Sequence, residues 1–235
     1  MPTLYIDIET IPAQRPDVLE EIRATIKPPA TFKKPESIAE WMRTEGPGAA
    51  DEAYRRTSLD GTFGQVAVIG VAIDGGTPTA IYEADWEAPD AEHRVLEAFG
   101  HQLTDLIEPA DVFSTVVVGH NVSAFDLRFL AQRSIVHGLR PHTVISRSAQ
   151  AKPWETEKVF DTMVQWAGAK DRITLDKLCR ALSIESPKGE LDGSKVWEYI
   201  QAGRMAEVVD YCMRDIEATR RVHLRMTFAG QLQAA

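Results

Sequence analysis

Residues 3–10 read Thr3-Leu4-Tyr5-Ile6-Asp7-Ile8-Glu9-Thr10, and this stretch decides the fold of the 235-residue chain. Its aliphatic residues Leu4, Ile6 and Ile8 recur at every second position, a period that predicts a β-strand. In such a strand Asp7 and Glu9 share one face, where neighbouring carboxylates repel each other and lose hydration. Hard divalent cations take carboxylate oxygens as ligands, so the pair indicates a metal site.

The Asp-x-Glu pattern alone is weak support for a metal site, because the chain contains it four times. Only the first copy lies within an apolar strand pattern. The other three occupy polar loop or helix contexts, where solvated carboxylates are expected: Asp85/Glu87, Asp90/Glu92 and Asp215/Glu217. A metal site therefore needs further ligands from elsewhere in the chain.

Strand and helix patterns follow along the rest of the chain. Residues 13–60, divided by five prolines, are expected to form an insertion with short helices over 17–26 and 36–44 and a weaker one over 49–56. Apolar runs predict strands over 65–73, 79–82, 112–118 and 158–161. Helices are predicted over 90–107, 124–137, 162–168, 175–182, 195–202 and 205–226. This order predicts one α/β domain over residues 1–235, built on a mixed five-stranded sheet flanked by helices.

A second group of polar residues follows the predicted strand 112–118. The sequence there is Gly119-His120-Asn121-Val122-Ser123-Ala124-Phe125-Asp126. The glycine breaks the strand, and Asp126 falls in the first turn of the next helix, where the helix dipole favours a carboxylate. Ordinary helix-start chemistry for Ser123 or Asp126 is the alternative. Phe125 would be a core residue or an aromatic ring available to a base.

A third group lies on the last predicted helix, in Tyr211-Cys212-Met213-Arg214-Asp215. At about 100° per residue, Tyr211 and Asp215 lie roughly 40° apart around the helix. Both fall at the edge of its apolar stripe, from which a helix packed on a sheet can point polar groups into a cleft. A tyrosine covering the core beside a solvated aspartate is the alternative.

Taken together and in this order, the three groups resemble the DEDDy class of 3′–5′ exonucleases, in the DnaQ-like branch of the ribonuclease H-like fold. The chain looks closest to stand-alone exonucleases related to the proofreading domain of family-B DNA polymerases, and residues 192–197, Asp-Gly-Ser-Lys-Val-Trp, support that match. The resemblance covers most of the chain and is weakest over 13–60. It implies a metal-dependent enzyme that releases nucleoside 5′-monophosphates from 3′ ends, single-stranded DNA being the expected substrate.

The same resemblance assigns roles by position. Four carboxylates would bind two divalent cations, Mg²⁺ or Mn²⁺, with Asp7 bridging both ions: Asp7, Glu9, Asp126 and Asp215. Tyr211 would orient the attacking water, because a phenol with a pKa near 10 is a poor base at neutral pH. Contact with substrate is expected from Thr10, His120, Asn121 and Phe125. Asp161 would be either a fifth carboxylate or, more simply, a helix N-cap.

The charge of the chain is unevenly distributed. Its net charge of −9 opposes nucleic-acid binding, yet four carboxylates loaded with two divalent cations would change it to −5. Residues 127–153 contain no Asp or Glu but several basic residues, and we expect a phosphate-contacting surface there, with Arg133, Arg140 and Arg147. An ordinary solvated face is the alternative.

Composition bounds the remaining possibilities. The chain is 44% hydrophobic, enough for a sizeable core. It has no apolar run near the ~20 residues that span a bilayer, so no membrane association and a cytoplasmic location are expected. Cys179 and Cys212 are expected to be buried thiols. Two other functions stay open, a 3′–5′ exoribonuclease on short RNA and a non-catalytic nucleic-acid-binding module. The sequence contains no Gly-rich phosphate loop, which argues against nucleotidyl transfer and Walker-type ATP hydrolysis.

Overall fold

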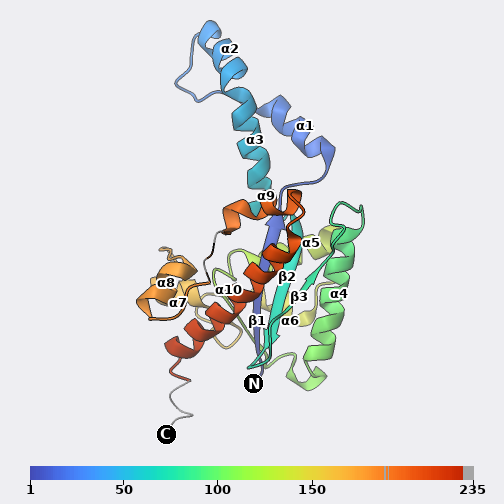
Figure 1. Ribbon diagram of the computed structural model, residues 1–235, viewed down its shortest axis with the longest axis vertical. Coiled ribbons are helices and arrows are strands. Elements are labelled where there is room, and N and C mark those ends of the chain that lie inside the picture. Colours follow the sequence, from blue (N-terminus) through green and yellow to red (C-terminus); the bar gives the residue numbers. More distant parts are fainter. Residues whose placement is uncertain (188, 190, 230–235) are drawn as a thin grey trace. The chain divides into compact units, whose positions relative to one another are not determined.

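The computed structural model describes residues 1–187, 189 and 191–229. The chain divides into two compact units, one comprising residues 1–9 and the chain from residue 66 onward, the other comprising residues 10–65. The second unit contains the three helices expected from the sequence, in which α3 packs against both α1 and α2 (Figure 1). Their bounds are α1 Pro16–Thr25, α2 Pro35–Thr44 and α3 Gly46–Arg56, followed by the 3₁₀ turn η1 Thr57–Leu59.

The first unit is built on a five-stranded sheet with strand order β3-β2-β1-β4-β5. β1 is parallel to β4 and β4 is parallel to β5, whereas β2 and β3 pair antiparallel. The sheet is therefore mixed, as predicted. The strand bounds are β1 Thr3–Ile11, β2 Gln65–Ile73, β3 Thr79–Tyr82, β4 Val116–Gly119 and β5 Val159–Asp161.

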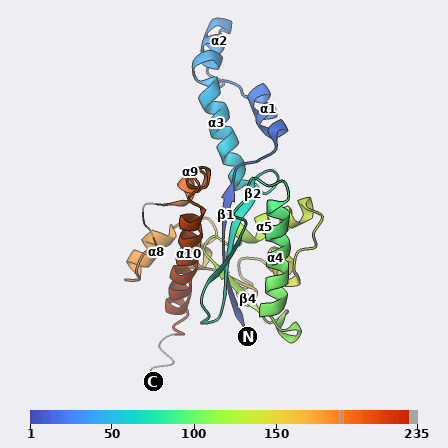
Figure 2. The same cartoon turned by 45° about the vertical axis from the view of Figure 1, so that its right-hand side comes forward.

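Helices cover both faces of this sheet. Leu4, Ile6 and Ile8 pack into the main core with α4 (Ala91–Leu106) and α5 (Asp126–Val136). Tyr5, on the other face, packs in a cluster with Ile216 of α10 (Met205–Met226). Figure 2 shows α10 and α4 on opposite sides of the sheet. The period-two pattern of β1 thus separates an aliphatic face from a face that looks toward α10.

Two parts of the first unit differ from the sequence prediction. β4 begins at Val116 rather than at residue 112, because the backbone N–H groups of Ser114 and Thr115 both donate to the C=O of Asp111 and make a turn. This turn follows the 3₁₀ turn η2 (Pro109–Asp111). The sequence analysis also missed a six-residue helix, α6 (Thr143–Ser148), which is too short to show a helical period. The remaining helices are α7 Thr162–Ala167, α8 Leu175–Ala181 and, after the 3₁₀ turn η3 Gly193–Lys195, α9 Val196–Gln201.

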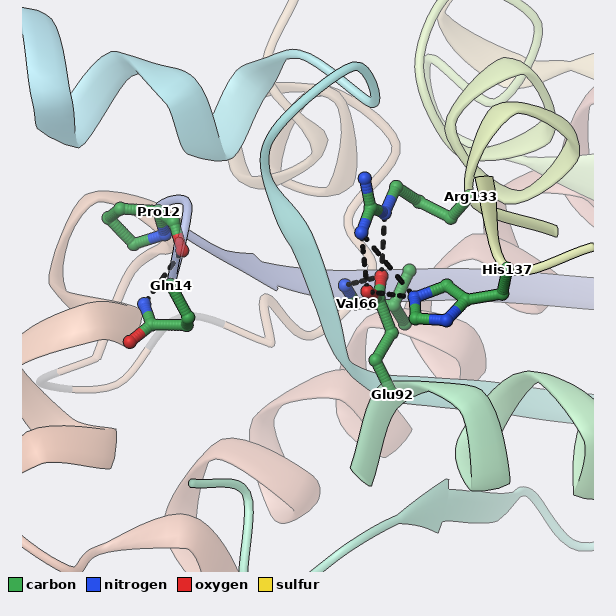
Figure 3. Close-up of polar contacts among 6 residues, drawn as sticks. All are labelled: Pro12, Gln14, Val66, Glu92, Arg133 and His137. Atoms are coloured by element: carbon green, nitrogen blue, oxygen red, sulfur yellow. Dashed lines mark hydrogen bonds and ion pairs between the residues drawn. The ribbon is translucent and has the colours of Figure 1, made fainter. Parts of the chain in front are cut away.

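A buried charge network fixes α4, α5 and the start of β2 to one another (Figure 3). The carboxylate of Glu92 accepts hydrogen bonds from the guanidinium of Arg133 at 2.8 and 2.6 Å and from the backbone N–H of Val66 at 2.9 Å. His137 Nε2 lies 2.7 Å from the same carboxylate. The expectation that Glu92 is solvated is therefore wrong, because the fold supplies it with a buried cationic partner.

Two expectations from composition can be compared with the structure. Cys179 and Cys212 are both free and buried, as expected. No helix in the described ranges is long and apolar enough to cross a membrane.

Replacing Arg133 by alanine should cost about 3–5 kcal/mol of unfolding free energy, because it leaves the Glu92 carboxylate buried without its cation. Urea unfolding followed by circular dichroism measures the loss. Arg128→Ala is the matched control, since Arg128 is an exposed arginine on the same helix, and it should change stability by no more than about 0.5 kcal/mol. Equal losses in the two variants would contradict a structural role for the Glu92–Arg133 pair.

Candidate active site

Asp7 and Glu9 lie on the face of β1 that α10 covers. The thiol of Cys212, on α10, donates to the backbone C=O of Asp7 at a sulfur–oxygen distance of 3.6 Å. One ligand atom from each of Asp7, Glu9 and Cys212 lies within 4.8 Å of the others. The predicted carboxylate pair is therefore adjacent in space and faces the helix that carries Tyr211 and Asp215.

A glycine in β2 lets α10 come this close to the sheet. A Cβ atom added to Gly70 would lie 2.5 Å from Cδ1 of Ile216 and 2.8 Å from Sγ of Cys212. Those distances are too short for any side chain, so only glycine allows the contact. The sequence analysis did not single out Gly70, although it interrupts the apolar run of β2 and a glycine within a strand signals close approach of another segment.

Asp126 reaches the same region from the start of α5. Its side chain is buried, and its Oδ1 accepts a hydrogen bond from the backbone N–H of Ile8 at 3.0 Å. Ile8 lies between the two acidic residues of β1, so this bond places Asp126 beside them. The chain turns sharply after β4 because Gly119 has no Cβ, and one built there would lie 2.5 Å from Cβ of Val122.

Tyr211 and Asp215 complete the group. Burial, with contributions from Asp215, Glu9 and Asp7, raises the pKa of the Tyr211 hydroxyl well above its usual value, so the phenol stays protonated. The neighbouring Tyr211 hydroxyl lowers the pKa of the Asp215 carboxyl and so partly offsets the effect of burial. Asp215 Oδ1 is buried and has no hydrogen-bond partner among the described residues.

The electrostatics of the site are dominated by four carboxyl groups withdrawn from water. Burial raises the pKa of Asp126 to about 7 and that of Asp215 to about 6. Burial and the neighbouring carboxylates raise the pKa values of Asp7 and Glu9 well above their usual range. None of the four forms an ion pair with a described residue. Four uncompensated carboxylates of this kind are hard oxygen donors that fit divalent cations.

Cys212 contributes to the packing of the site rather than to its ligand set. Burial and the charges of Asp7 and Glu9 raise the pKa of its thiol well above the ordinary value. A metal-binding cysteine must be a thiolate. The protonated thiol instead donates to β1 and holds α10 against the strand.

Asp161 is a helix N-cap, the simpler of its two expected roles. Its carboxylate accepts hydrogen bonds from the backbone N–H groups of Met163 and Val164, at the start of α7. It also accepts from the N–H groups of Asn121 and Ser123, each at 3.0 Å. Four donors satisfy this buried carboxylate, which ties the loop between β4 and α5 to the end of β5.

His120 is held by both of its ring nitrogens. Nε2 donates to the backbone C=O of Ile173 at 2.9 Å, and Nδ1 lies 2.9 Å from the hydroxyl of Thr162. Burial lowers the pKa of the imidazole. Neither nitrogen is available to a substrate proton in this arrangement, which makes His120 a structural link between the loop and α7.

The other three residues expected to contact substrate, Asn121, Phe125 and Thr10, lie in different surroundings. Asn121 has a left-handed backbone, with φ of 66°, and its buried Oδ1 has no hydrogen-bond partner in the described part of the chain. Phe125 is half-buried, with its ring centroid 5.5 Å from that of Phe129. Thr10 belongs to the second unit, where its hydroxyl donates to the C=O of Ser58 at 2.7 Å.

The arginines expected to form a phosphate-contacting surface do not act together. Arg133 is buried in its ion pair with Glu92. Arg147 donates to the backbone C=O groups of Phe113 and Thr115 at 2.8 and 2.5 Å. Only Arg140 is exposed. The acid-free stretch of sequence was a poor guide here, because two of its arginines already have partners within the fold.

Comparisons with known proteins agree with this geometry. A family model described as a predicted 3′–5′ exonuclease related to the exonuclease domain of PolB matches residues 62–235. Among solved structures, the family B DNA polymerase from the hyperthermophilic archaeon Pyrobaculum calidifontis is similar, with a TM-score of 0.58 and 16% sequence identity. That similarity covers 97% of this chain but only 24% of the polymerase chain. No curated protein matches the sequence. The structural likeness confirms the expected ribonuclease H-like fold.

The raised pKa values of the four carboxyl groups predict how the stability of the metal-free protein depends on pH. A carboxyl with a raised pKa keeps a proton that the unfolded chain releases above about pH 4. The folded state therefore loses stability as pH rises through about 6 and 7, the pKa values of Asp215 and Asp126. In EDTA, the melting temperature at pH 8 should be lower than at pH 5, and Asp7→Asn should reduce the difference.

Asp85→Asn is the control for this measurement, because Asp85 is an exposed aspartate from another Asp-x-Glu pair. It should leave the difference between the two melting temperatures unchanged. Identical behaviour of Asp7→Asn and Asp85→Asn would show that the carboxylate cluster does not destabilise the folded chain.

Proposed function

Because the chain belongs to the family of predicted 3′–5′ exonucleases related to the exonuclease domain of PolB, we propose that it hydrolyses the last phosphodiester bond at the 3′ end of single-stranded DNA and releases nucleoside 5′-monophosphates. The observation that carries this proposal is the group of four carboxyl groups and one tyrosine, in which Glu9 and Asp126 are buried while Asp7, Asp215 and Tyr211 are half-buried. They come from three separate parts of the chain: β1, the start of α5, and α10.

The residues present fit a pair of divalent cations, Mg²⁺ or Mn²⁺. Carboxylate oxygens are the ligands these ions prefer, and Asp215 Oδ1 is buried without a hydrogen-bond partner in the described part of the chain. Asp7, Glu9, Asp126 and Asp215 would hold the ions. When bound, two such ions activate a water molecule and stabilise the charge that develops on the leaving 3′ oxygen.

Tyr211 orients the attacking water in this proposal. Its raised pKa keeps the hydroxyl protonated at neutral pH, so it acts as a hydrogen-bond partner and not as a base. Asn121, with its unpartnered Oδ1, and the exposed part of the Phe125 ring are assigned to contact with the terminal nucleotide.

Asp7→Ala should lower the rate of 3′-end hydrolysis by about 10³-fold, since loss of a carboxylate that would hold the ions removes several kcal/mol of transition-state stabilisation. The assay follows a 5′-labelled single-stranded oligonucleotide with Mg²⁺ or Mn²⁺, as DNA and as RNA of the same sequence. Asp85→Ala is the matched control and should retain full activity. Equal rates for Asp7→Ala and wild type would refute the catalytic assignment, and faster hydrolysis of the RNA would identify an exoribonuclease.

Tyr211→Phe keeps the aromatic ring and removes only the hydroxyl, so it should lower kcat by about 10²-fold while KM and the midpoint of the Mn²⁺ titration stay unchanged. Tyr82→Phe, on the exposed face of β3, is the control and should match wild type. A loss of Mn²⁺ affinity in Tyr211→Phe, instead of a loss of kcat, would assign the hydroxyl to holding Asp215 and not to orienting water.

A further inference from the structure

The connection between α1 and α2 is the most basic part of the second unit. Residues 22–35 contain Arg23, Lys27, Lys33 and Lys34 and no acidic residue, within a chain whose net charge is −9. All four basic side chains are exposed. Sequence patterns gave this region no function, and the family match begins only at residue 62.

The basic residues of this unit fall into two groups according to their partners. The other four arginines each pair with a carboxylate close by in sequence: Arg15 with Asp17, Arg43 with Glu40, Arg55 with Asp51 and Arg56 with Glu52. The four on residues 22–35 form no ion pair with any described residue. Uncompensated positive charge is thus concentrated on one connection.

An aromatic ring lies within this basic connection. Phe32 is 38% exposed and immediately precedes Lys33 and Lys34. Its backbone N–H donates to the C=O of Pro29 at 3.0 Å, which closes a turn. The segment thus presents an exposed phenyl ring beside two ammonium groups.

The backbone of this connection is restrained before any ligand binds. Pro28 and Pro29 fix φ at two successive positions, and Pro35 begins α2. Both ends of the connection are anchored, because α3 packs against α1 and against α2 (Figure 1). A restrained segment loses less conformational entropy on binding than a free one.

From these observations we propose that residues 22–35 bind single-stranded nucleic acid, with Arg23, Lys27, Lys33 and Lys34 contacting phosphates and Phe32 stacking on a base. Basic side chains follow a phosphate backbone, and an exposed aromatic ring supplies the stacking surface that single strands use without sequence preference. An acidic protein would match the charge but gives no reason for the exposed ring. This inference rests on the proposed function, because the strand bound by residues 22–35 would be the single-stranded nucleic acid that the candidate active site hydrolyses.

Binding without hydrolysis tests this surface directly. Fluorescence anisotropy of the full chain in EDTA, with labelled thirty-residue oligothymidylate and oligouridylate, gives affinity as a function of salt concentration. Each phosphate contact to a single strand contributes about 0.7 to the slope of log affinity against log salt. The triple variant Lys27→Gln/Lys33→Gln/Lys34→Gln should therefore lower the magnitude of that slope by about 2. Phe32→Ala should weaken binding about 5- to 100-fold with little change in slope.

The control is Arg55→Gln/Arg56→Gln, which removes two arginines of the same unit that already have carboxylate partners. It should leave both affinity and slope close to wild type, and circular dichroism verifies that each variant is folded. A triple variant with the wild-type slope, or a wild-type chain that binds neither oligonucleotide, overturns the proposal.

Failure of the proposed function would look different. If the wild-type chain hydrolyses no oligonucleotide with Mg²⁺ or Mn²⁺, but the triple variant still lowers the salt slope, the surface is supported and the catalytic proposal fails. If the chain is active and the triple variant binds with an unchanged slope, the catalytic proposal stands and the surface is refuted.

Discussion

One electrostatic constraint shapes the first unit, because four carboxyl groups, two of them buried and two half-buried, lie together on the side of the sheet that α10 covers. Withdrawing like charges from water raises the pKa values of Asp7, Glu9, Asp126 and Asp215, and protonation or a bound cation must offset the cost. A chain selected only for stability would place apolar residues there. That the fold keeps these carboxyl groups despite their cost in folding free energy indicates a functional site. This agrees with the membership of the chain in a family of predicted exonucleases.

The rest of the first unit holds these groups in place through close helix packing and hydrogen bonds. Gly70 admits α10 to close contact with β2, and the Cys212 thiol links that helix to the backbone of Asp7. The N–H of Ile8 orients Asp126, while Asp161 uses four backbone donors to fix the loop that precedes it. The buried carboxylates of Glu92 and Asp161, outside the cluster, are matched by a guanidinium or by backbone donors, whereas the four site carboxylates form no ion pair with a described residue.

Arginine and lysine are used differently in the two units. In the first unit, Arg133 pairs with the buried carboxylate of Glu92 and Arg147 donates to two backbone C=O groups, where a planar guanidinium with several donors suits fixed geometry. In the second unit, the arginines outside residues 22–35 pair with carboxylates nearby in sequence, while the basic residues of 22–35 are exposed and form no ion pair with a described residue. The partners of a basic residue, more than its presence in an acid-free stretch, decide whether it can contact phosphate.

Sequence patterns alone predicted most strands and helices and the residues of the candidate catalytic group, but missed α6 and placed the start of β4 too early. The periods of β1, β2 and α10 predicted their positions closely, because burial of one face leaves a strong pattern of apolar residues. Which polar residues have internal partners becomes clear only from the packing of the elements in three dimensions. Glu92 and Arg133 are far apart in sequence and find each other through the packing of α4 on α5, and His120 is held by Thr162 and Ile173 in the same way. Such pairings depend on distances in three dimensions, which no local pattern of residues records.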